Sequence, residues 1–415
     1  MTILCLDFVL NIKVLGGKQR RYFNWNDSYV WGGDMEMNLD RWIKKLDETN
    51  TYFSIGTSFV SKHEKDEDII LGTDKRLNLP VNVGAFSARI KLQKGDYSFM
   101  SEYAWKANDP SFDNAYIYKC GNALLLSGSY SKKGMSILLQ AKRSDNMSFR
   151  SSRSMKGSSS FINHLPAFTL LQTYTLATIY PYATQIAAGE WAFQGEFNYT
   201  FKRNTLIGGK YGTKIRANAS YIRSIDKTPV SPNSNVSIAD LYKGTNGYTS
   251  SFFKFGDEIY YQDYALNIEK KIVKDFSFNF MYSHQYYNQK VIEGHSEDGI
   301  VHANIFVGEG KYQVNKKIFI RSELQYLQTK EDKGDWYAAL IELSIAPYLS
   351  FSLSDSYNAG TTKTHYYSGN VVFNTNSHRL LIGYGRTREG YNCSGGICRY
   401  IPASKGFTLS YNYIF

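Results

Sequence analysis

The residue types that most often carry out catalysis are present in this chain, but their spacing defines no enzyme. A nucleophile elbow of the form Gly-x-Ser-x-Gly, a His-Glu-x-x-His zinc pair and a phosphate-binding glycine loop are all missing from the sequence. The histidines are scattered along the chain: His63, His164, His284, His295, His302, His365 and His378. We therefore expect no enzyme, no metal site and no cofactor. A catalytic pair that only the folded chain assembles is the alternative left open.

Two cysteines lie close enough together to close a small loop. Cys393 and Cys398 enclose Ser-Gly-Gly-Ile, a spacing that does not match a two-residue zinc knuckle, and no second ligand pair follows. We expect a disulfide in an oxidising compartment, with two free thiols as the alternative. Cys5 and Cys120 have no evident partner in the sequence.

Most of the chain alternates between apolar and polar residues with a period of two. In the final segment, Phe407, Leu409, Tyr411, Tyr413 and Phe415 alternate with small polar residues, as a strand between lipid and water requires. The segment 276–283 repeats this pattern, and we expect Phe276, Phe278 and Phe280 to point outward and Ser277 and Asn279 inward.

The same pattern predicts a series of long strands joined mostly by short turns, with 39–47 as the one short helical candidate. The strands are expected at 28–38, 51–62, 82–94, 96–106, 122–131, 134–144, 168–179, 190–202, 209–222, 257–271, 274–290, 299–312, 315–329, 333–346, 348–358, 364–374, 377–388 and 404–415. Many of these segments are long enough to cross a bilayer at a tilt. The sequence therefore predicts an all-β, antiparallel, up-and-down transmembrane β-barrel of about 16–20 strands.

The composition agrees with an all-β chain. Among 415 residues there are 34 tyrosines, 25 phenylalanines and 8 prolines, and aromatic residues favour strands whereas proline interrupts them. The mean hydropathy of −0.39 does not exclude a membrane protein, because alternate residues of a barrel strand face water. The net charge of +11 is scattered rather than striped along a helix, so we expect no nucleic-acid partner.

Several charged residues fall on the polar face of the expected strands and are candidates for the lumen wall. They are Lys142, Glu196, Lys214, Arg216, Glu269, Arg321 and Glu323. Ion pairs that brace neighbouring strands are one interpretation of these residues. A charged ring that selects solutes is the other.

The lengths of the connections orient the expected barrel. The tight turns at Asn374-Thr-Asn376, Ala346-Pro347, Gln313-Val-Asn315 and Ile272-Val-Lys274 fall at one end, and the long segments 223–256, 291–298 and 389–403 fall at the other. Outer-membrane barrels place short turns in the periplasm and long loops outside.

One connection breaks the expected alternation of strand direction. The strands 134–144 and 168–179 run the same way, so 145–167 must cross back as a missed strand or fold through the lumen, unless it is a solvated loop. Its run from Ser148 to Ser160 is basic and hydroxyl-rich, as a constriction in the lumen would be, but polar runs of serine and glycine usually mark loops, so we favour the solvated loop.

The terminal strand, with Tyr411, Tyr413 and Phe415, is similar to the signal that the bacterial barrel-assembly machinery reads; a chance terminal phenylalanine is the alternative. The stretch that contains Gly383-Tyr-Gly-Arg-Thr-Arg388 and runs to Tyr413 resembles a family of uncharacterised Bacteroidota outer-membrane proteins. Leu15-Gly-Gly-Lys-Gln-Arg-Arg-Tyr-Phe23, Asn108-Asp-Pro-Ser-Phe-Asp-Asn114 and Ser144-Asp-Asn-Met-Ser-Phe-Arg-Ser151 are similar to it too.

This resemblance implies a location and a fold, but no activity. We expect one domain over 1–415 in the bacterial outer membrane, with outer-membrane lipid, lipopolysaccharide and the barrel-assembly machinery as partners. Residues 1–12 do not look like a signal peptide, so we expect the chain to lack an N-terminal portion. The expected function is a pore or transporter for small hydrophilic solutes. The alternative is a structural or accessory barrel of a secretion or surface-assembly system, with the long loops as its binding surface.

Overall fold

The computed structural model describes residues 9–21, 23–73, 75–156, 159–294, 299–394 and 397–414. The main sheet has 18 strands. They are β1 (Leu10–Gly17), β4 (Tyr29–Asn38), β5 (Thr51–His63), β8 (Asn82–Lys94), β9 (Tyr97–Lys106), β10 (Gly121–Lys132), β11 (Met135–Asp145), β12 (Glu190–Phe201), β13 (Thr213–Ile225), β16 (Phe255–Val273), β17 (Phe276–Asn288), β18 (Ile300–Gln313), β19 (Ile318–Gln328), β20 (Trp336–Ile345), β21 (Leu349–Asn358), β22 (His365–Asn374), β23 (His378–Thr387) and β26 (Ser404–Tyr413).

The remaining elements are short and lie in connections. They are β2 (Arg20–Arg21), β3 (Asn24–Trp25), β6 (Ile70–Leu71), β7 (Lys75–Arg76), β14 (Thr228–Pro229), β15 (Tyr248–Thr249), β24 (Gly390–Ser394), β25 (Ile397–Ile401), the helices α1 (Lys44–Glu48) and α2 (Gln289–Ile292), and the 3-10 turns η1 (Leu39–Arg41), η2 (Phe112–Asn114), η3 (Leu176–Thr178) and η4 (Ile238–Asp240). The helical candidate at 39–47 is thus confirmed as η1 and α1. Among the described residues, no helix has the length and apolar character needed to cross a membrane.

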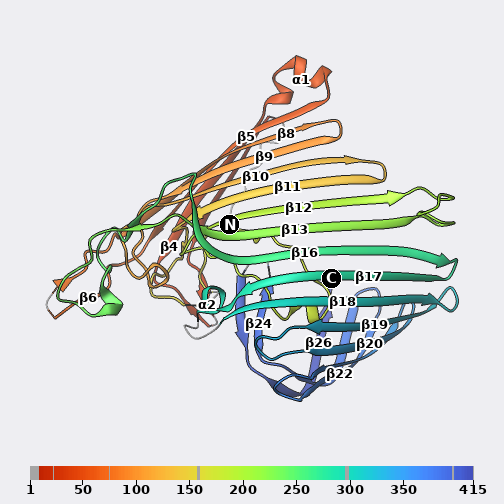
Figure 1. The fold of residues 1–415 in the computed structure, drawn as a ribbon. Helices are drawn as coiled ribbons and strands as arrows, with labels where there is room; N and C mark the ends of the chain where they lie inside the picture. Colours follow the sequence, from red (N-terminus) through yellow and green to blue (C-terminus); the bar gives the residue numbers. More distant parts are fainter. Residues whose placement is uncertain are drawn as a thin grey trace.

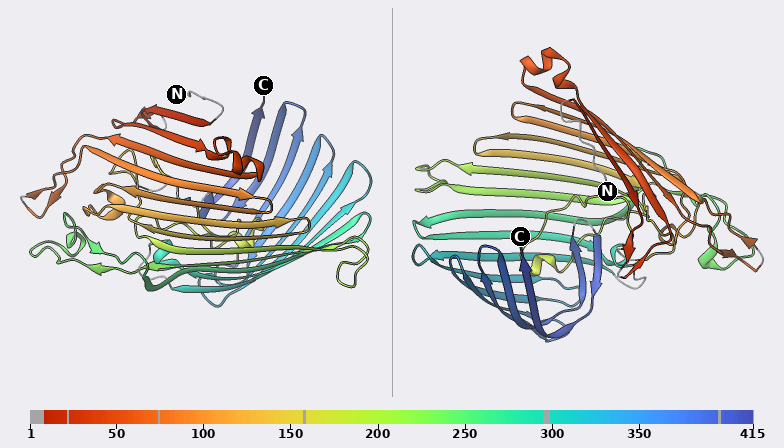
Figure 2. Two further views of the ribbon diagram at one scale, coloured as in Figure 1. Left: turned by 90° about the horizontal axis from the view of Figure 1, so that it is seen from above. Right: turned by 180° about the vertical axis from the view of Figure 1, so that it is seen from behind.

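Each strand of the main sheet pairs antiparallel with the next main-sheet strand along the chain. The predicted all-β, up-and-down architecture is therefore confirmed. The sheet curves into a trough, with the first strands on one side and the last strands on the other (Figures 1 and 2). Within the described residues no strand register joins β1 to β26, so the two outer strands are the edges of an open sheet.

The two ends of the strands differ in their connections. The turn end carries 95–96, 133–134, 274–275, 314–317, 346–348 and 375–377, together with the longer connections 39–50 and 202–212, and the loop end carries 64–81, 107–120, 226–254, 289–299 and 388–403. This separation confirms the predicted grouping of short turns and long connections. Loops at the loop end extend well beyond the sheet around β6, whereas α1 lies at the turn end (Figure 1).

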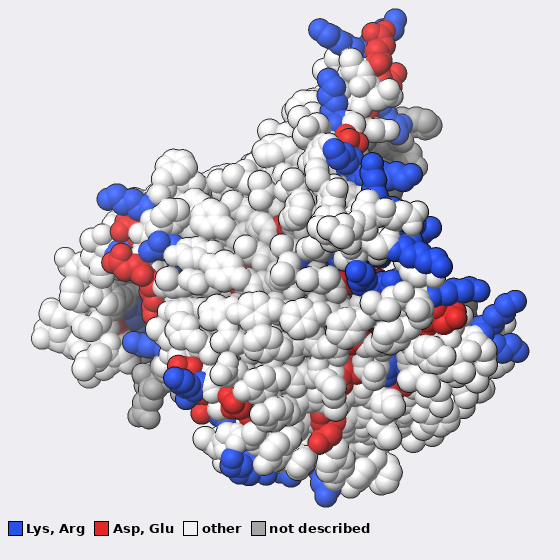
Figure 3. Space-filling view, turned by 45° about the vertical axis from the view of Figure 1, so that its right-hand side comes forward, with Lys and Arg blue, Asp and Glu red and all other residues white. Residues whose placement is uncertain are grey.

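The convex face of the sheet is apolar. At mid-strand the outward residues include Ile341 on β20, Leu353 on β21 and Leu409 on β26, which are 53%, 64% and 74% exposed. The outward Phe278 and Phe280 of β17 are exposed as well, and the alternation predicted for this strand is confirmed. Figure 3 shows a broad face of uncharged residues, with most of its charged groups near the margins.

The concave face is covered in part by a segment that leaves β11 and returns at β12. We call residues 146–189 the inner segment. Its side chains Tyr174, Leu176, Ala177 and Tyr180 form one buried core with Val301, Ala303, Ile305 and Val307 on the inner face of β18. The predicted strand at 168–179 is therefore wrong, because these residues contain only the η3 turn and pack against the wall instead of joining it.

The favoured solvated loop for 145–167 is wrong too. Met147, Phe149, Arg150, Ser151 and Arg153 are all at most 4% exposed. The alternative, a segment folded over the interior of the sheet, is the one observed. The mismatch in strand direction disappears because β11 and β12 pair directly, with Ser144 opposite Glu190.

Candidate functional site

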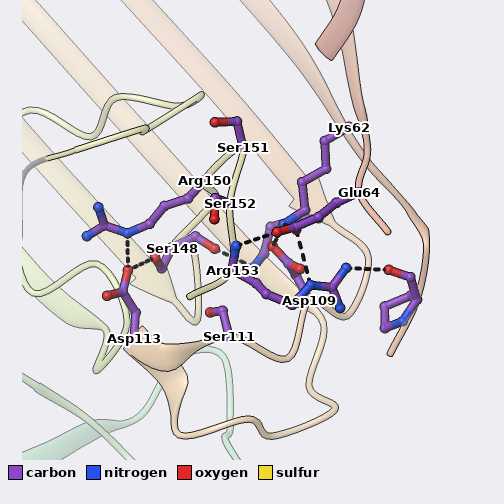
Figure 4. A network of polar contacts seen from close by, with 12 residues as sticks. Lys62, Glu64, Asp109, Ser111, Asp113, Ser148, Arg150, Ser151, Ser152 and Arg153 are labelled. Atoms are coloured by element: carbon purple, nitrogen blue, oxygen red, sulfur yellow. Dashed lines mark hydrogen bonds and ion pairs between the residues drawn. The ribbon is translucent and has the colours of Figure 1, made fainter. Parts of the chain in front are cut away.

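The inner segment and the concave face beneath it are the candidate functional site. A network of charged side chains, which we call the rim network, holds the first part of the segment at the loop end (Figure 4). Its members are Lys62, Glu64, Lys106, Asp109, Asp113, Ser148, Arg150 and Arg153. They come from the ends of β5 and β9, from the connections 64–81 and 107–120 and from the inner segment.

Glu64 is the centre of the rim network. Its carboxylate lies 3.0 Å from Lys62 Nζ and 3.1 Å from Arg153 Nε, and it accepts a hydrogen bond of 2.8 Å from the Arg153 amide. Lys62 Nζ also lies 2.9 Å from Asp109 Oδ2. Because Lys62, Asp109 and Arg153 are at most 1% exposed, each charge depends on its protein partners rather than on water.

Three further contacts connect the inner segment to the rest of the rim network. Lys106 Nζ donates a hydrogen bond of 2.6 Å to the Ser148 carbonyl, and Arg150 Nε lies 2.6 Å from Asp113 Oδ2. Ser148 Oγ donates to the same Asp113 carboxylate. Removing one member of a buried ion pair leaves an uncompensated charge, which costs about 3–5 kcal/mol. The rim network therefore fixes the beginning of the inner segment firmly.

The second part of the inner segment is fixed on the concave face by hydrogen bonds to β17, β18 and β19. Tyr174 Oη donates a hydrogen bond of 2.8 Å to Glu309 Oε2 on β18 and accepts one of 2.6 Å from Asn279 Nδ2 on β17. The Leu176 amide donates to Gln325 Oε1 at 3.0 Å, and Gln285 Nε2 donates to the Ala177 carbonyl at 3.1 Å. Side chains of the wall thus satisfy backbone groups that a strand would satisfy in a ladder.

The phenol of Tyr174 is held in its neutral form. Burial and the hydrogen bond to Glu309 raise its pKa far above the usual value for tyrosine. The phenol therefore remains a hydrogen-bond donor to Glu309 at any physiological pH.

The predicted lumen residues all lie on strands of the wall, and several of them form ion pairs. Lys142 Nζ is fully buried and lies 2.7 Å from Glu190 Oε1 at the exit of the inner segment. Lys214 Nζ and Arg216 Nη2 lie 3.6 and 3.9 Å from Glu269 on the neighbouring strand. Glu196 accepts a hydrogen bond of 3.2 Å from Gln194 Nε2.

Arg321 is the centre of a second charged cluster on the concave face. Its guanidinium lies 2.6 Å from Glu309 and 3.6 Å from Glu342, and it also contacts Glu323. The structure therefore brings together Arg321 and Glu323, and separately Lys214, Arg216 and Glu269. It does not bring all seven predicted residues into one ring.

The sequence analysis missed a charged strip on the concave face of the first strands. Arg89 on β8 lies 2.6 Å from Asp34 and 3.0 Å from Glu36 on β4, and Lys91 lies 2.9 Å from Glu36. The alternation on β4 and β8 could have revealed these residues, since Asp34 and Glu36 alternate with Met35 and Met37.

The rim network was also missed. No local pattern signals it, because its partners lie far apart in the sequence. Glu64 and Arg153, for example, are 89 positions apart.

The predicted disulfide and assembly signal remain predictions. β24 and β25 form a hairpin in which Cys393 is opposite Cys398, but these two side chains lie outside the described residues. Tyr411 and Tyr413 are exposed on β26, which pairs along one side with β23. Phe415 lies outside the described residues. In the part of the chain that is described, no cluster of three or more His, Cys, Asp or Glu side chains could hold a metal ion.

Solved structures similar to this chain are outer-membrane proteins of low identity. The ferric-catecholate import receptor Fiu from E. coli K12 is 10% identical, with 97% of this chain and 68% of that chain covered and a TM-score of 0.37. A mutant ferric enterobactin receptor, PfeA, from Pseudomonas aeruginosa is 8% identical, with 98% and 72% covered and a TM-score of 0.39. A mutant of the Rh. blastica porin is 9% identical, with 82% and 94% covered and a TM-score of 0.33.

Similarity at this level assigns no activity to the chain, and no curated protein matches it. A family model does match, over residues 4–415, and its description reads "Family of unknown function (DUF6029)". Because this match spans nearly the whole sequence, the chain belongs to the DUF6029 family.

Proposed function

We propose that this sheet is the wall of a bacterial outer-membrane pore that admits small hydrophilic solutes past the inner segment. The observation that carries the proposal is the difference between the two faces of the sheet. The convex face exposes apolar side chains, whereas the concave face carries the Arg89, Arg321 and Lys214–Arg216 charge clusters. A membrane wall needs this arrangement, because lipid contacts one face and water the other.

The proposal includes the orientation of the wall. The turn end faces the periplasm and the loop end faces outward, as in other outer-membrane barrels. The inner segment then forms a fixed constriction, since it is anchored both by the rim network and by Tyr174. The charged clusters that remain accessible around it select the solutes that pass.

Single-channel recording in a planar bilayer tests the proposal, with protein extracted from the outer membrane under native conditions. We expect discrete conductance steps. The side chains of Lys214 and Arg216 are 53% and 63% exposed, so the double variant Lys214→Glu, Arg216→Glu should shift the reversal potential in a salt gradient toward cation selectivity.

The matched control is Lys316→Glu, Lys317→Glu, which makes the same charge change in the turn between β18 and β19. This control should leave the reversal potential unchanged. The absence of conductance steps in the native protein, or an equal shift in both double variants, would refute the pore.

A second candidate function is supported by the loops at the loop end. Lys243 Nζ donates to the Ile70 carbonyl at 2.8 Å, and Tyr118 Oη donates to the Asn78 carbonyl at 2.7 Å, so three long loops form one platform. Ile238 and Phe253 are 90% and 81% exposed on the same connection of this platform. An accessory barrel would use such a surface to bind a partner protein.

The two functions differ in what the platform contributes. If the accessory function holds, Ile238→Ser with Phe253→Ser should remove a protein that copurifies with the native complex and leave conductance unchanged. If copurification is the same with and without these substitutions, the platform is not the binding surface.

A further inference from the structure

The convex face has a hollow of about 840 Å³ that extends over the neighbouring strands β8–β13 (Figure 1). We call it the outer groove. Its centre is one row of residues that are directly opposite one another from β9 to β13: Phe99, Gly128, Leu139, Gly195 and Ala219. The groove is hollow because three members of this row have almost no side chain.

Gly128 marks space that no atom of the protein fills. A Cβ atom added there would meet nothing within 4 Å, and the extended backbone of Gly128 is one that any residue adopts. Leu139 lies between Gly128 and Gly195 and is 63% exposed, because neither neighbour shields it. The outer groove is therefore an open site of fixed shape, set by the backbone of the sheet.

Two lysines and two tyrosines mark the turn end of the outer groove. Lys94 on β8 is opposite Tyr97 on β9, which is opposite Tyr130 on β10. The centroids of the two tyrosine rings are 4.8 Å apart, and Lys132 Nζ lies 5.8 Å from the centroid of the Tyr130 ring. Both lysines are exposed, and neither forms an ion pair within the described residues. Their charges are thus available to an anion outside the protein.

An apolar groove with cations at one end matches the two parts of an anionic phospholipid. Among the described residues that line the groove, Lys94 is the only charged one. Six strands at a spacing of about 4.8 Å give the groove a length of about 24 Å. One leaflet of the hydrocarbon core is about 15 Å thick, so an acyl chain fits along the groove. Lysines near the membrane surface attract the phosphate of an anionic lipid.

A second copy of this chain is a poorer match to the same groove. Two copies in one membrane have the same orientation, so the turn-end cations of the second copy would lie at the level of Lys94 and Lys132. These cations include Arg203 and Lys270, which form no ion pair within the described residues. Like charges at one level repel each other, whereas a lipid phosphate neutralises them.

We propose that the outer groove is a binding site for one anionic phospholipid of the periplasmic leaflet. An acyl chain lies along Gly128, Gly195 and Ala219, and the phosphate lies beside Lys94 and Lys132. The site rests on the proposed function for the position of the wall in the outer membrane, with the turn end toward the periplasm.

Native mass spectrometry counts the lipids that stay bound to the protein after extraction under native conditions and washing with detergent. The probes are phosphatidylglycerol and phosphatidylcholine with the same acyl chains. We expect one phosphatidylglycerol to be retained by each chain. Lys94→Gln with Lys132→Gln should weaken its binding about fivefold for each lysine removed and leave phosphatidylcholine binding unchanged. Gly128→Leu should abolish the retention of both lipids, because its side chain fills the groove.

Two control variants make the same changes elsewhere on the wall. Gly308→Leu fills a second hollow on the convex face, whose described lining contains no lysine or arginine, and its Cβ would make ordinary contact, 3.8 Å from the Phe278 ring. Lys316→Gln with Lys317→Gln removes two exposed lysines from the turn between β18 and β19. Both controls should retain phosphatidylglycerol as the native chain does, and equal trypsin resistance of all four variants shows that each is folded.

Each outcome decides the proposal. No retained phosphatidylglycerol, or equal retention by the test and control variants, overturns it. A dimer that Gly128→Leu dissociates would assign the groove to a second copy and overturn it as well. Lipid retention that depends on Gly128 and the two lysines, without channel current, would support the lipid site and refute the pore. Channel current without retained lipid would do the reverse.

Discussion

In the proposed membrane wall, an outward side chain at the middle of a strand lies deepest in the lipid. Leu353 lies near the centre of β21 and is 64% exposed, whereas its neighbour Ser352 faces the concave side, where Asn370 lies. In the proposed wall, Leu353 meets lipid and Ser352 meets water. Substitutions at these two adjacent positions therefore separate the effect of lipid contact on stability from the effect of a change within the strand.

Leu353→Arg is expected to lower the free energy of unfolding in lipid vesicles by about 2–4 kcal/mol, because a charged group near the bilayer midplane is poorly solvated. Urea titration of the vesicle-embedded protein measures this difference. Ser352→Arg should cost much less. Equal losses for the two variants would mean that the convex face does not contact lipid.

Glu67, in the connection 64–81, is expected to destabilise the loop at neutral pH. Burial, and then the nearby Glu64 carboxylate, raise its pKa above the usual value of 4.5. A carboxyl whose pKa is raised by folding contributes stability below its unfolded pKa and loses that contribution as the pH rises through its folded pKa. Glu67→Gln should therefore raise the melting temperature at pH 7, and the gain should shrink as the pH falls toward 4.5.

The control for this substitution is Glu48→Gln on α1, where the side chain is 62% exposed. That variant should melt like the native protein at both pH values. A gain for Glu67→Gln that is the same at both pH values would contradict the titration of this group.

At the scale of elements, the strands were predictable and the inner segment was not. β16 and β17 follow from period two and from the turn between them, because a strand with one apolar and one polar face alternates along its length. Residues 168–179 also resemble a strand, yet they lie across the wall, because Leu176 and Tyr174 are bound by Gln325 and Glu309 from distant strands. Local patterns carry no information about such partners.

One signal of the inner segment was available in the sequence of β18. Val301, Ala303, Ile305 and Val307 make its inner face apolar. An inner face that meets water would be polar, so this apolar face indicates that something covers it. The candidate site could thus have been placed over β18, though its members could not have been named.

Leu176→Ala is expected to loosen the inner segment by about 2–5 kcal/mol, because it opens a cavity where Leu176 is fully buried. Limited proteolysis within the inner segment and an increased single-channel conductance would report this loss. Leu171→Ala, at a position in the same segment that is 80% exposed, provides the comparison. If both variants are cleaved at the same rate, Leu176 does not anchor the segment.

At the scale of the whole molecule, the two edges of the sheet are complementary in direction. β1 runs from the turn end toward the loop end, and β26 runs the opposite way. They have the polarity for antiparallel pairing, with each other or with further strands. Backbone groups that remain unpaired in lipid cost several kcal/mol each, so these edges need partners in a membrane.

These 415 residues, refolded alone in detergent, should therefore show one position on a gel whether or not the sample is heated. Closed barrels migrate differently before heating because their complete ladder resists the detergent. Native outer-membrane extracts serve as the comparison. A faster, heat-sensitive band from the refolded chain alone would mean that β1 and β26 can close the ring by themselves.

The apolar inner face of β18 has a consequence for the way the molecule loses structure. The inner segment cannot leave without exposing that strip to water, so the segment and the strands β16–β20 should open together as one cooperative unit. In the described core, β22 contributes the partly buried Tyr366, β21, β23 and β26 contribute no residue, and β26 is an edge. Amide hydrogen exchange should therefore proceed inward from the last strands and reach β18 late, together with Leu176 and Ala177. The most stable unit of this protein would then be the inner segment together with β16–β20, and the remaining strands would be attached to this unit.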